Sequence, residues 1–248
     1  MESLGLLEFA FAAGVLVLAY AVRGATGFGA PMIAVPLLAL VMPLKVLVPA
    51  IVVLTMLSAF GHLWQDWSRI HWKELRRLVP PSTVGVLVGL YLLHAADVRL
   101  LLKGFGGFVI SYACFSLATA SRPMRLPERA LGPASLLFGG AAGLMGAAFG
   151  AAAGPFYVVY LNSCGLERDV FRVTVSTILT ILAVLVIAGY LRLGILDSGT
   201  MALVGAGLPL MVLGTVLGHR IARWLNPRWF SVAVSLLLVV SGIGLMFK

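Results

Sequence analysis

The feature that most constrains this sequence is a succession of long apolar runs separated by short loops. A helix needs about 20 apolar residues to cross the hydrocarbon core of a bilayer. Eight runs approach that length, at residues 4–22, 45–63, 78–94, 99–119, 131–149, 171–190, 200–218 and 230–247. Two shorter apolar segments lie at residues 30–42 and 154–164. The sequence therefore predicts an all-α polytopic membrane protein with about ten segments and no sizeable domain outside the bilayer.

The composition supports this class and excludes others. Hydrophobic residues make up 61% of the chain and charged residues only 11%, which excludes a water-soluble globule. The net charge of +9 is spread over short loops, so we expect no nucleic-acid partner and attribute the charge to basic cytoplasmic loops. Cys114 and Cys164 lie apart in apolar stretches, and the sequence indicates no disulfide framework, metal site or cofactor.

The two halves of the chain carry matching landmarks. Gly29-Ala30-Pro31 and Ala153-Gly154-Pro155 lie 124 residues apart, which is half of 248. Gly85-x-x-x-Gly89 likewise matches Gly214-x-x-x-Gly218, a spacing typical of closely packed helix faces. We interpret the chain as a duplication, with a first repeat at 1–120, a linker at 121–130 and a second repeat at 131–248.

Loop charge indicates how the repeats are oriented. If the two short segments dip in and return, the 18 Lys and Arg residues divide evenly between the two sides of the membrane. If both segments cross, thirteen lie on one side and five on the other, as expected for a cytoplasmic side. The sequence therefore predicts two inverted repeats of five segments, with loops 62–77 and 120–130 in the cytoplasm and both termini on the opposite side. Whether segments 30–42 and 154–164 cross completely is left open.

Each short segment follows a glycine-rich break and has a proline near its start. A helix start leaves amide donors unpaired and carries partial positive charge, so each break is a potential anion cradle. Matching interrupted helices in two halves also indicate a transporter binding site. The alternative is that the glycines only allow tight helix packing. The candidate binding residues here are Gly24, Thr26, Gly27, Phe28, Gly29, Pro31, Gly150, Gly154, Pro155 and Tyr157.

Other polar residues in the spans give further candidates. A ladder of Arg172, Thr174, Ser176 and Thr177 begins the apolar run at 171–190. These hydroxyl groups could contact an anion, or they could bond back to their own helix while the arginine reaches the headgroups.

Two ionisable residues are secondary candidates. Arg23 borders the first break and could steer an anion, although a basic residue at the end of a span is commonly a headgroup anchor. Glu8 lies one turn inside the first span and could take part in proton coupling or sit in the outer headgroup zone.

The break from Gly24 to Leu37 resembles the glycine-rich signature of the TauE/SafE sulfite exporter family, and its second copy runs from Gly146 to Leu161. The similarity extends into Val46 to Phe60 and Val170 to Val184. This resemblance implies a multi-pass transporter of the bacterial inner membrane that exports sulfite, an organosulfonate or a related small anion.

The leading hypothesis is thus a carrier that holds a small anion between the two breaks and works by alternating access. An anion channel lined by the same elements is the alternative. An enzyme is disfavoured, because we find no H-E-x-x-H motif, no paired intramembrane aspartates and no nucleophile with a matching histidine base. The expected partners are the substrate and the lipid bilayer, and a homodimer is left open.

Overall fold

The computed structural model of the chain describes residues 6–26, 29–63, 67–119, 126–150, 153–221, 236 and 238–245. Almost all of these residues are helical. A short 3-10 turn at Trp67–Arg69 precedes the fourth helix, and residues 238–245 are also helical. The α-helices are α1 (Leu6–Thr26), α2 (Ala30–Leu38), α3 (Leu44–Leu63), α4 (Trp72–Ala95), α5 (Val98–Thr119), α6 (Glu128–Phe149), α7 (Ala153–Ser163), α8 (Arg168–Arg192) and α9 (Ser198–Ile221).

The predicted fold class, an all-α polytopic membrane protein, is confirmed. Among the described residues, α1, α4, α6, α8 and α9 are long and apolar enough to cross a membrane, and α3 contains a shorter apolar stretch at Leu44–Ala59. The run at 230–247 lies partly outside the described residues. The sequence misplaced two ends: α4 begins at Trp72, six residues before its apolar run, and α2 ends at Leu38 in a turn before Pro43.

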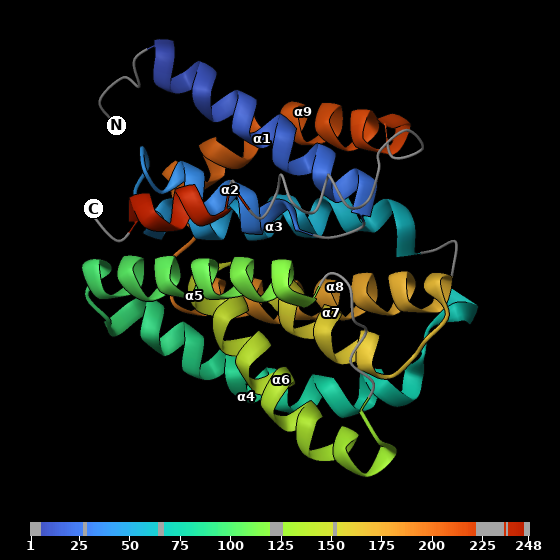
Figure 1. Cartoon of the computed structure of the whole chain (residues 1–248). Coiled ribbons are helices and arrows are strands. Elements are labelled where there is room, and N and C mark those ends of the chain that lie inside the picture. Colours follow the sequence, from blue (N-terminus) through green and yellow to red (C-terminus); the bar gives the residue numbers. More distant parts are fainter. Residues whose placement is uncertain are drawn as a thin grey trace.

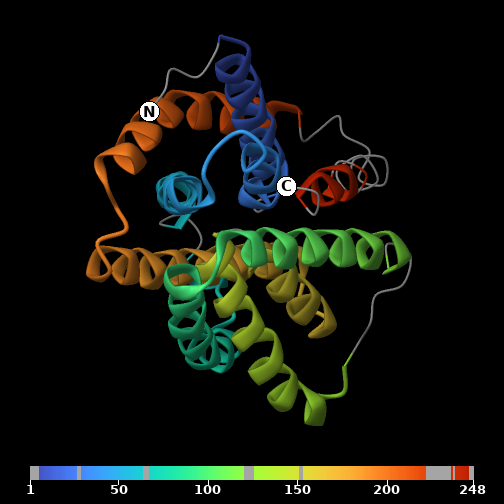
Figure 2. The ribbon, with the colours of Figure 1, turned by 90° about the vertical axis from the view of Figure 1, so that its left-hand side faces the viewer.

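The helices pack into two bodies, each of which combines helices from both halves of the sequence. In the first body, α1 packs on α2 and α9, and α3 packs on α2 and α9. In the second body, α4 packs on α6 and α8, and α7 packs on α6 and α8. Both views show the blue and orange helices of the first body above the green and gold helices of the second (Figure 1, Figure 2). Contacts between the bodies run mainly from α3 to α8.

Glycine faces bring the long helices of each body into close contact. A Cβ atom added at Gly85 would overlap the Gly140 carbonyl oxygen, and one at Gly143 would overlap the Ser82 carbonyl oxygen. In the first body, a Cβ atom at Gly218 would overlap the Ala21 carbonyl oxygen. The prediction that both G-x-x-x-G faces pack closely is therefore confirmed, because backbones this near each other leave no room for a side chain.

Contacts along the helices give their relative directions. The Thr174 hydroxyl near the start of α8 accepts a hydrogen bond from the His71 amide at the start of α4, at 3.0 Å, and Gly189 near the end of α8 faces Leu90 near the end of α4. The helices α4 and α8 therefore run parallel.

The helix α6 runs in the same direction as α4 and α8. Gly139 lies against Leu78 near the start of α4, and Gly89, further along α4, lies against Leu144. Since α6 and α8 run the same way, the intervening α7 runs opposite to both (Figure 1).

The short helix α7 returns the chain to the level at which α6 begins. The Leu126 amide, just before α6, donates to the Ser163 carbonyl at the end of α7, at 3.3 Å. An ion pair of 3.5 Å joins Arg69, just before α4, to Asp169 at the start of α8. One end of the molecule therefore gathers the starts of α4, α6 and α8, together with the described parts of the basic loops 62–77 and 120–130.

The helix directions predict on which side of the membrane two exposed residues lie. Ser68 and Asp197 are both exposed and lie at opposite ends of the α4–α8 pair. In a variant with Cys114 and Cys164 replaced by serine, Ser68→Cys and Asp197→Cys should react with an impermeant thiol reagent from opposite sides of the membrane. Labelling of both from the same side of intact cells would contradict the inverted arrangement.

Candidate functional site

A cavity lies between the two bodies, where the two glycine-rich breaks meet. It encloses about 450 Å³ of space not filled by atoms, a volume that includes open solvent at its mouth. The first body contributes Arg23, Gly29, Pro31, Val52 and Thr55. The second body contributes Gly146, Gly150, Ala153, Gly154, Leu179, Leu182, Ala183 and Val186. Val52 and Thr55 lie near the middle of α3, and the α8 residues lie near the middle of α8, so the cavity is at mid-depth.

Glycine is required at one position in each break. Gly29 caps the start of α2 with φ 95° and ψ −8°, and Gly150 ends α6 with φ 66° and ψ −7°. Both conformations are left-handed and favour glycine over residues with a Cβ atom. These two residues turn the chain so that α2 and α7 begin at the cavity wall, where the first amides of a helix lack intrahelical partners.

The cavity contains one buried cation. Arg23, near the end of α1, is 6% exposed, and its Nη2 donates to the Thr55 carbonyl at 3.3 Å. Among the described residues, no acidic side chain pairs with Arg23. A buried charge without a counter-charge is costly. The site is therefore suited to an anion that supplies the missing negative charge.

The Thr55 residue organises the polar side of the cavity. Its hydroxyl shares a 3.3 Å hydrogen bond with the Tyr20 hydroxyl, and its carbonyl holds Arg23. The remaining wall is made of glycines, alanine and aliphatic side chains, which exclude water and strengthen electrostatic attraction. Among the described residues, no three His, Cys, Asp or Glu side chains group closely enough to hold a metal ion.

Five of the predicted residues meet at this cavity: Gly29, Pro31, Gly150, Gly154 and the secondary candidate Arg23.

Other candidates from the breaks lie elsewhere. Gly24 packs against α9, where a Cβ atom would overlap the Thr215 carbonyl oxygen, and Thr26 donates to the Val22 carbonyl at 2.9 Å. Pro155 is buried in α7 but is not part of the cavity wall. Gly27 and Phe28 lie outside the described residues.

The hydroxyl ladder of α8 ends two residues before Leu179, the first α8 residue of the cavity wall. Thr174 and Thr177 donate to the carbonyls of Val170 and Val173, at 2.7 and 2.9 Å, so their hydroxyls bond back to their own helix. Ser176 is half-buried and Arg172 is exposed, and neither lines the cavity. The exposed Glu8 lies in the first turn of α1.

Sequence reasoning missed Thr55, Glu74 and Ser82. Thr55 is surrounded by apolar residues in the sequence of α3, and a single hydroxyl forms no pattern. Glu74 is surrounded by basic residues in the sequence, and it falls within the predicted cytoplasmic loop 62–77. In the structure it is 3% exposed. The predicted candidate Tyr157 donates to Ser82 at 2.7 Å and does not line the cavity. The tyrosines of α7 could have indicated that Glu74 and Ser82 are hydrogen-bond partners, because buried tyrosine hydroxyls require partners.

Comparison with known proteins gives a consistent assignment. The profile of a family described as "Sulfite exporter TauE/SafE" matches residues 11–245. A protein described as "Probable inner membrane transporter protein TsaS", from Comamonas testosteroni, is 27% identical over 197 residues. That alignment covers 79% of this chain and 80% of the relative. No solved structure matches the chain significantly.

The hydrogen-bond pattern predicts different effects for two matched threonine variants. Thr55→Val removes a hydroxyl that holds Tyr20 beside the cavity, and should weaken sulfite binding to the purified protein about 3- to 10-fold, as expected for one buried hydrogen bond. Thr177→Val removes a hydroxyl bonded only to its own helix, and should change the dissociation constant less than about twofold. Equal losses in both variants, measured by calorimetry, would refute this assignment.

Proposed function

Because the chain belongs to the TauE/SafE sulfite exporter family, we propose that this membrane transporter carries a small sulfur-containing or organic anion through the cavity between its two bodies. The observation that carries the proposal is the buried Arg23 guanidinium, which lacks an acidic partner among the described residues. Guanidinium groups bind oxyanions such as carboxylates and phosphates with paired hydrogen bonds. An oxyanion of sulfur presents similar acceptor oxygens.

The two breaks complete the proposed binding site. The start of α2, with its cap residue Gly29, and the start of α7 lie on opposite sides of the cavity. Pro31 has no amide hydrogen, but the other unpaired amides at these two helix starts would add donors and partial positive charge to the charge of Arg23. Glycine at positions 29 and 154 would let the anion approach the backbone closely. The residues in direct contact with the anion would be Arg23, Thr55, Gly29, Ala153 and Gly154.

Alternating access is supported by the division into two bodies. The bodies meet mainly along α3 and α8, whose middles form opposite walls of the cavity. Rocking about this contact would expose the anion to each side in turn. We propose that the direction is export, in line with the description of the family.

The proposed orientation follows from helix direction and charge. The antiparallel course of α7 between α6 and α8 supports a second repeat that crosses five times, and hence repeats at 1–120 and 131–248 that are inverted. The end that gathers Arg69, Lys73 and Arg129 would face the cytoplasm of a cell bounded by its inner membrane. Both termini would then lie on the non-cytoplasmic side.

Transport measurements on two arginine variants test the proposal. Wild-type protein in liposomes should transport radiolabelled sulfite with saturation and counterflow. Arg23→Gln should raise the half-saturating concentration at least about tenfold, since charged hydrogen bonds to the anion are lost. Arg172→Gln changes an exposed arginine away from the cavity and serves as the matched control, with less than about a twofold effect.

Two results would contradict the proposal. Equal transport by wild type and Arg23→Gln, with both proteins folded and monodisperse, would exclude Arg23 as the anion-binding charge. Large unsaturable currents without counterflow would indicate the channel alternative in place of a carrier.

A further inference from the structure

A buried polar network outside the cavity joins α7 to α4. Glu74, in the first turn of α4, is 3% exposed, and Tyr160, near the end of α7, is fully buried. The Tyr160 hydroxyl donates to Glu74 Oε2 at 2.6 Å and lies 3.2 Å from the Leu131 carbonyl of α6. One phenol thus connects α7 to α4 and to α6.

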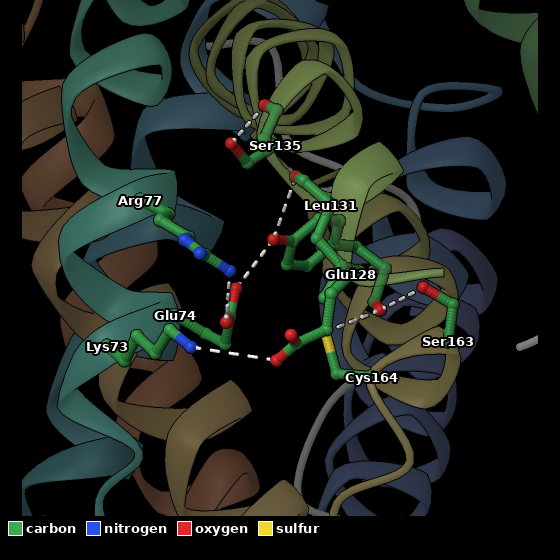
Figure 3. Close-up of polar contacts among 10 residues, drawn as sticks. Lys73, Glu74, Arg77, Glu128, Leu131, Ser135, Ser163 and Cys164 are labelled. Carbon is green, nitrogen blue, oxygen red and sulfur yellow. Dashed lines mark hydrogen bonds and ion pairs between the residues drawn. The ribbon is translucent and has the colours of Figure 1, made fainter. Parts of the chain in front are cut away.

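Both oxygens of the Glu74 carboxylate have partners. Arg77 donates from Nη1 to Oε1 at 2.8 Å, as Figure 3 shows, while Oε2 accepts from Tyr160. A buried carboxylate is tolerated when it is paired and hydrogen-bonded in this way. By contrast, the nearby pair of Lys73 and Glu128 spans 3.9 Å between largely exposed side chains, and such pairs contribute little.

A second hydrogen bond joins the same two helices closer to the cavity. Tyr157, also fully buried, donates to the Ser82 Oγ at 2.7 Å, and Ser82 donates in turn to the Leu78 carbonyl at 2.6 Å. Residues three apart lie on the same face of a helix. The two tyrosines therefore attach one face of α7 to α4 at two levels, which fixes both the rotation and the tilt of this short helix.

The helix α7 that these hydrogen bonds hold also forms part of the cavity wall. Ala153 and Gly154 form the first turn of α7 and line the cavity, and Tyr157 is on the next turn. Because α7 has 11 residues, a rotation or tilt at the tyrosines would displace this first turn relative to Arg23.

Among the residues of the first half that the structure describes, no hydrogen bond of this kind holds α2. At the 124-residue spacing, Tyr157 and Tyr160 correspond to Ile33 and Pro36 of α2. At the 129-residue spacing of the G-x-x-x-G faces, Glu74 and Ser82 correspond to Leu203 and Met211 of α9. These apolar side chains cannot form hydrogen bonds of this kind, so α2 is held by packing and α7 by directional bonds.

We propose that Glu74 and Ser82 are positioning residues of the anion site. Through Tyr160 and Tyr157 they hold α7 on α4, so that the Ala153–Gly154 turn stays opposite Arg23 across the cavity. Neither residue lines the cavity, so they act on anion affinity through α7. This inference rests on the proposed function.

Conservative substitutions separate positioning from a general structural role. In liposomes with radiolabelled sulfite, Tyr160→Phe and Tyr157→Phe should each raise the half-saturating concentration about 3- to 10-fold, with the maximal rate changed less than about twofold. Glu74→Leu should act like Tyr160→Phe, whereas Glu74→Gln keeps an acceptor for the phenol and should restore most of the affinity.

Two matched controls lie on the same helices outside the network. Tyr91→Phe changes a tyrosine of α4 that is 70% exposed, and Glu128→Gln changes the exposed acid of the surface pair. Both should leave the half-saturating concentration unchanged.

Hydrogen–deuterium exchange in lipid nanodiscs provides a readout that does not depend on transport. Tyr160→Phe should speed amide exchange in residues 153–163 and leave residues 30–38 unchanged. Unaltered exchange in α7 would overturn the inference.

The transport results also distinguish a failure of this inference from a failure of the proposed function. If the wild-type protein transports sulfite with saturation but Tyr160→Phe and Glu74→Leu keep its half-saturating concentration, the inference is wrong and the proposed function stands. A loss of folded protein and maximal rate at unchanged half-saturation would likewise overturn it, because that pattern marks a purely structural role. Absence of saturable transport in the wild-type protein would refute the proposed function, and the inference with it.

Discussion

One electrostatic constraint dominates the cavity, the buried guanidinium of Arg23. Its only described hydrogen bond goes to the Thr55 carbonyl, a neutral acceptor that does not cancel its charge. In an apolar protein interior this arrangement is stable only with a mobile counter-ion or water nearby. The cavity beside Arg23 provides space for such an ion, and the starts of two helices add partial positive charge from the opposite walls.

Each of the two bodies that enclose the cavity combines helices from both halves of the chain. Glycines bring two helices of each body into close contact, at Gly218 in the first and Gly143 in the second, and the two bodies meet along α3 and α8. The binding chemistry is unequal between them: the first body supplies the cation, and the second supplies the helix fixed by tyrosine hydrogen bonds. The two sides of the cavity therefore differ chemically.

The sequence predicted the helices and both breaks because apolar length and glycine–proline punctuation are local properties. It also predicted that Gly29 and Gly154 belong to one site, from their matching spacing. It could not rank Arg23 above Arg172, because burial depends on how α1 packs against α3 and on where α8 begins. The burial of Glu74 could not be predicted for the same reason: its neighbours in sequence are basic, while its partner Tyr160 lies 86 residues away. Pairings across the fold determine which polar residues are buried, and a local pattern does not contain them.

The most direct test of whether Arg23 binds the anion is a structure of the protein with selenite. Selenite is a heavier analogue of sulfite, and its anomalous signal locates it unambiguously. We expect one peak between the bodies, within hydrogen-bonding distance of Arg23 and beside Gly29 and Gly154. A peak beside Arg172 and the hydroxyls of α8, with none near Arg23, would contradict it.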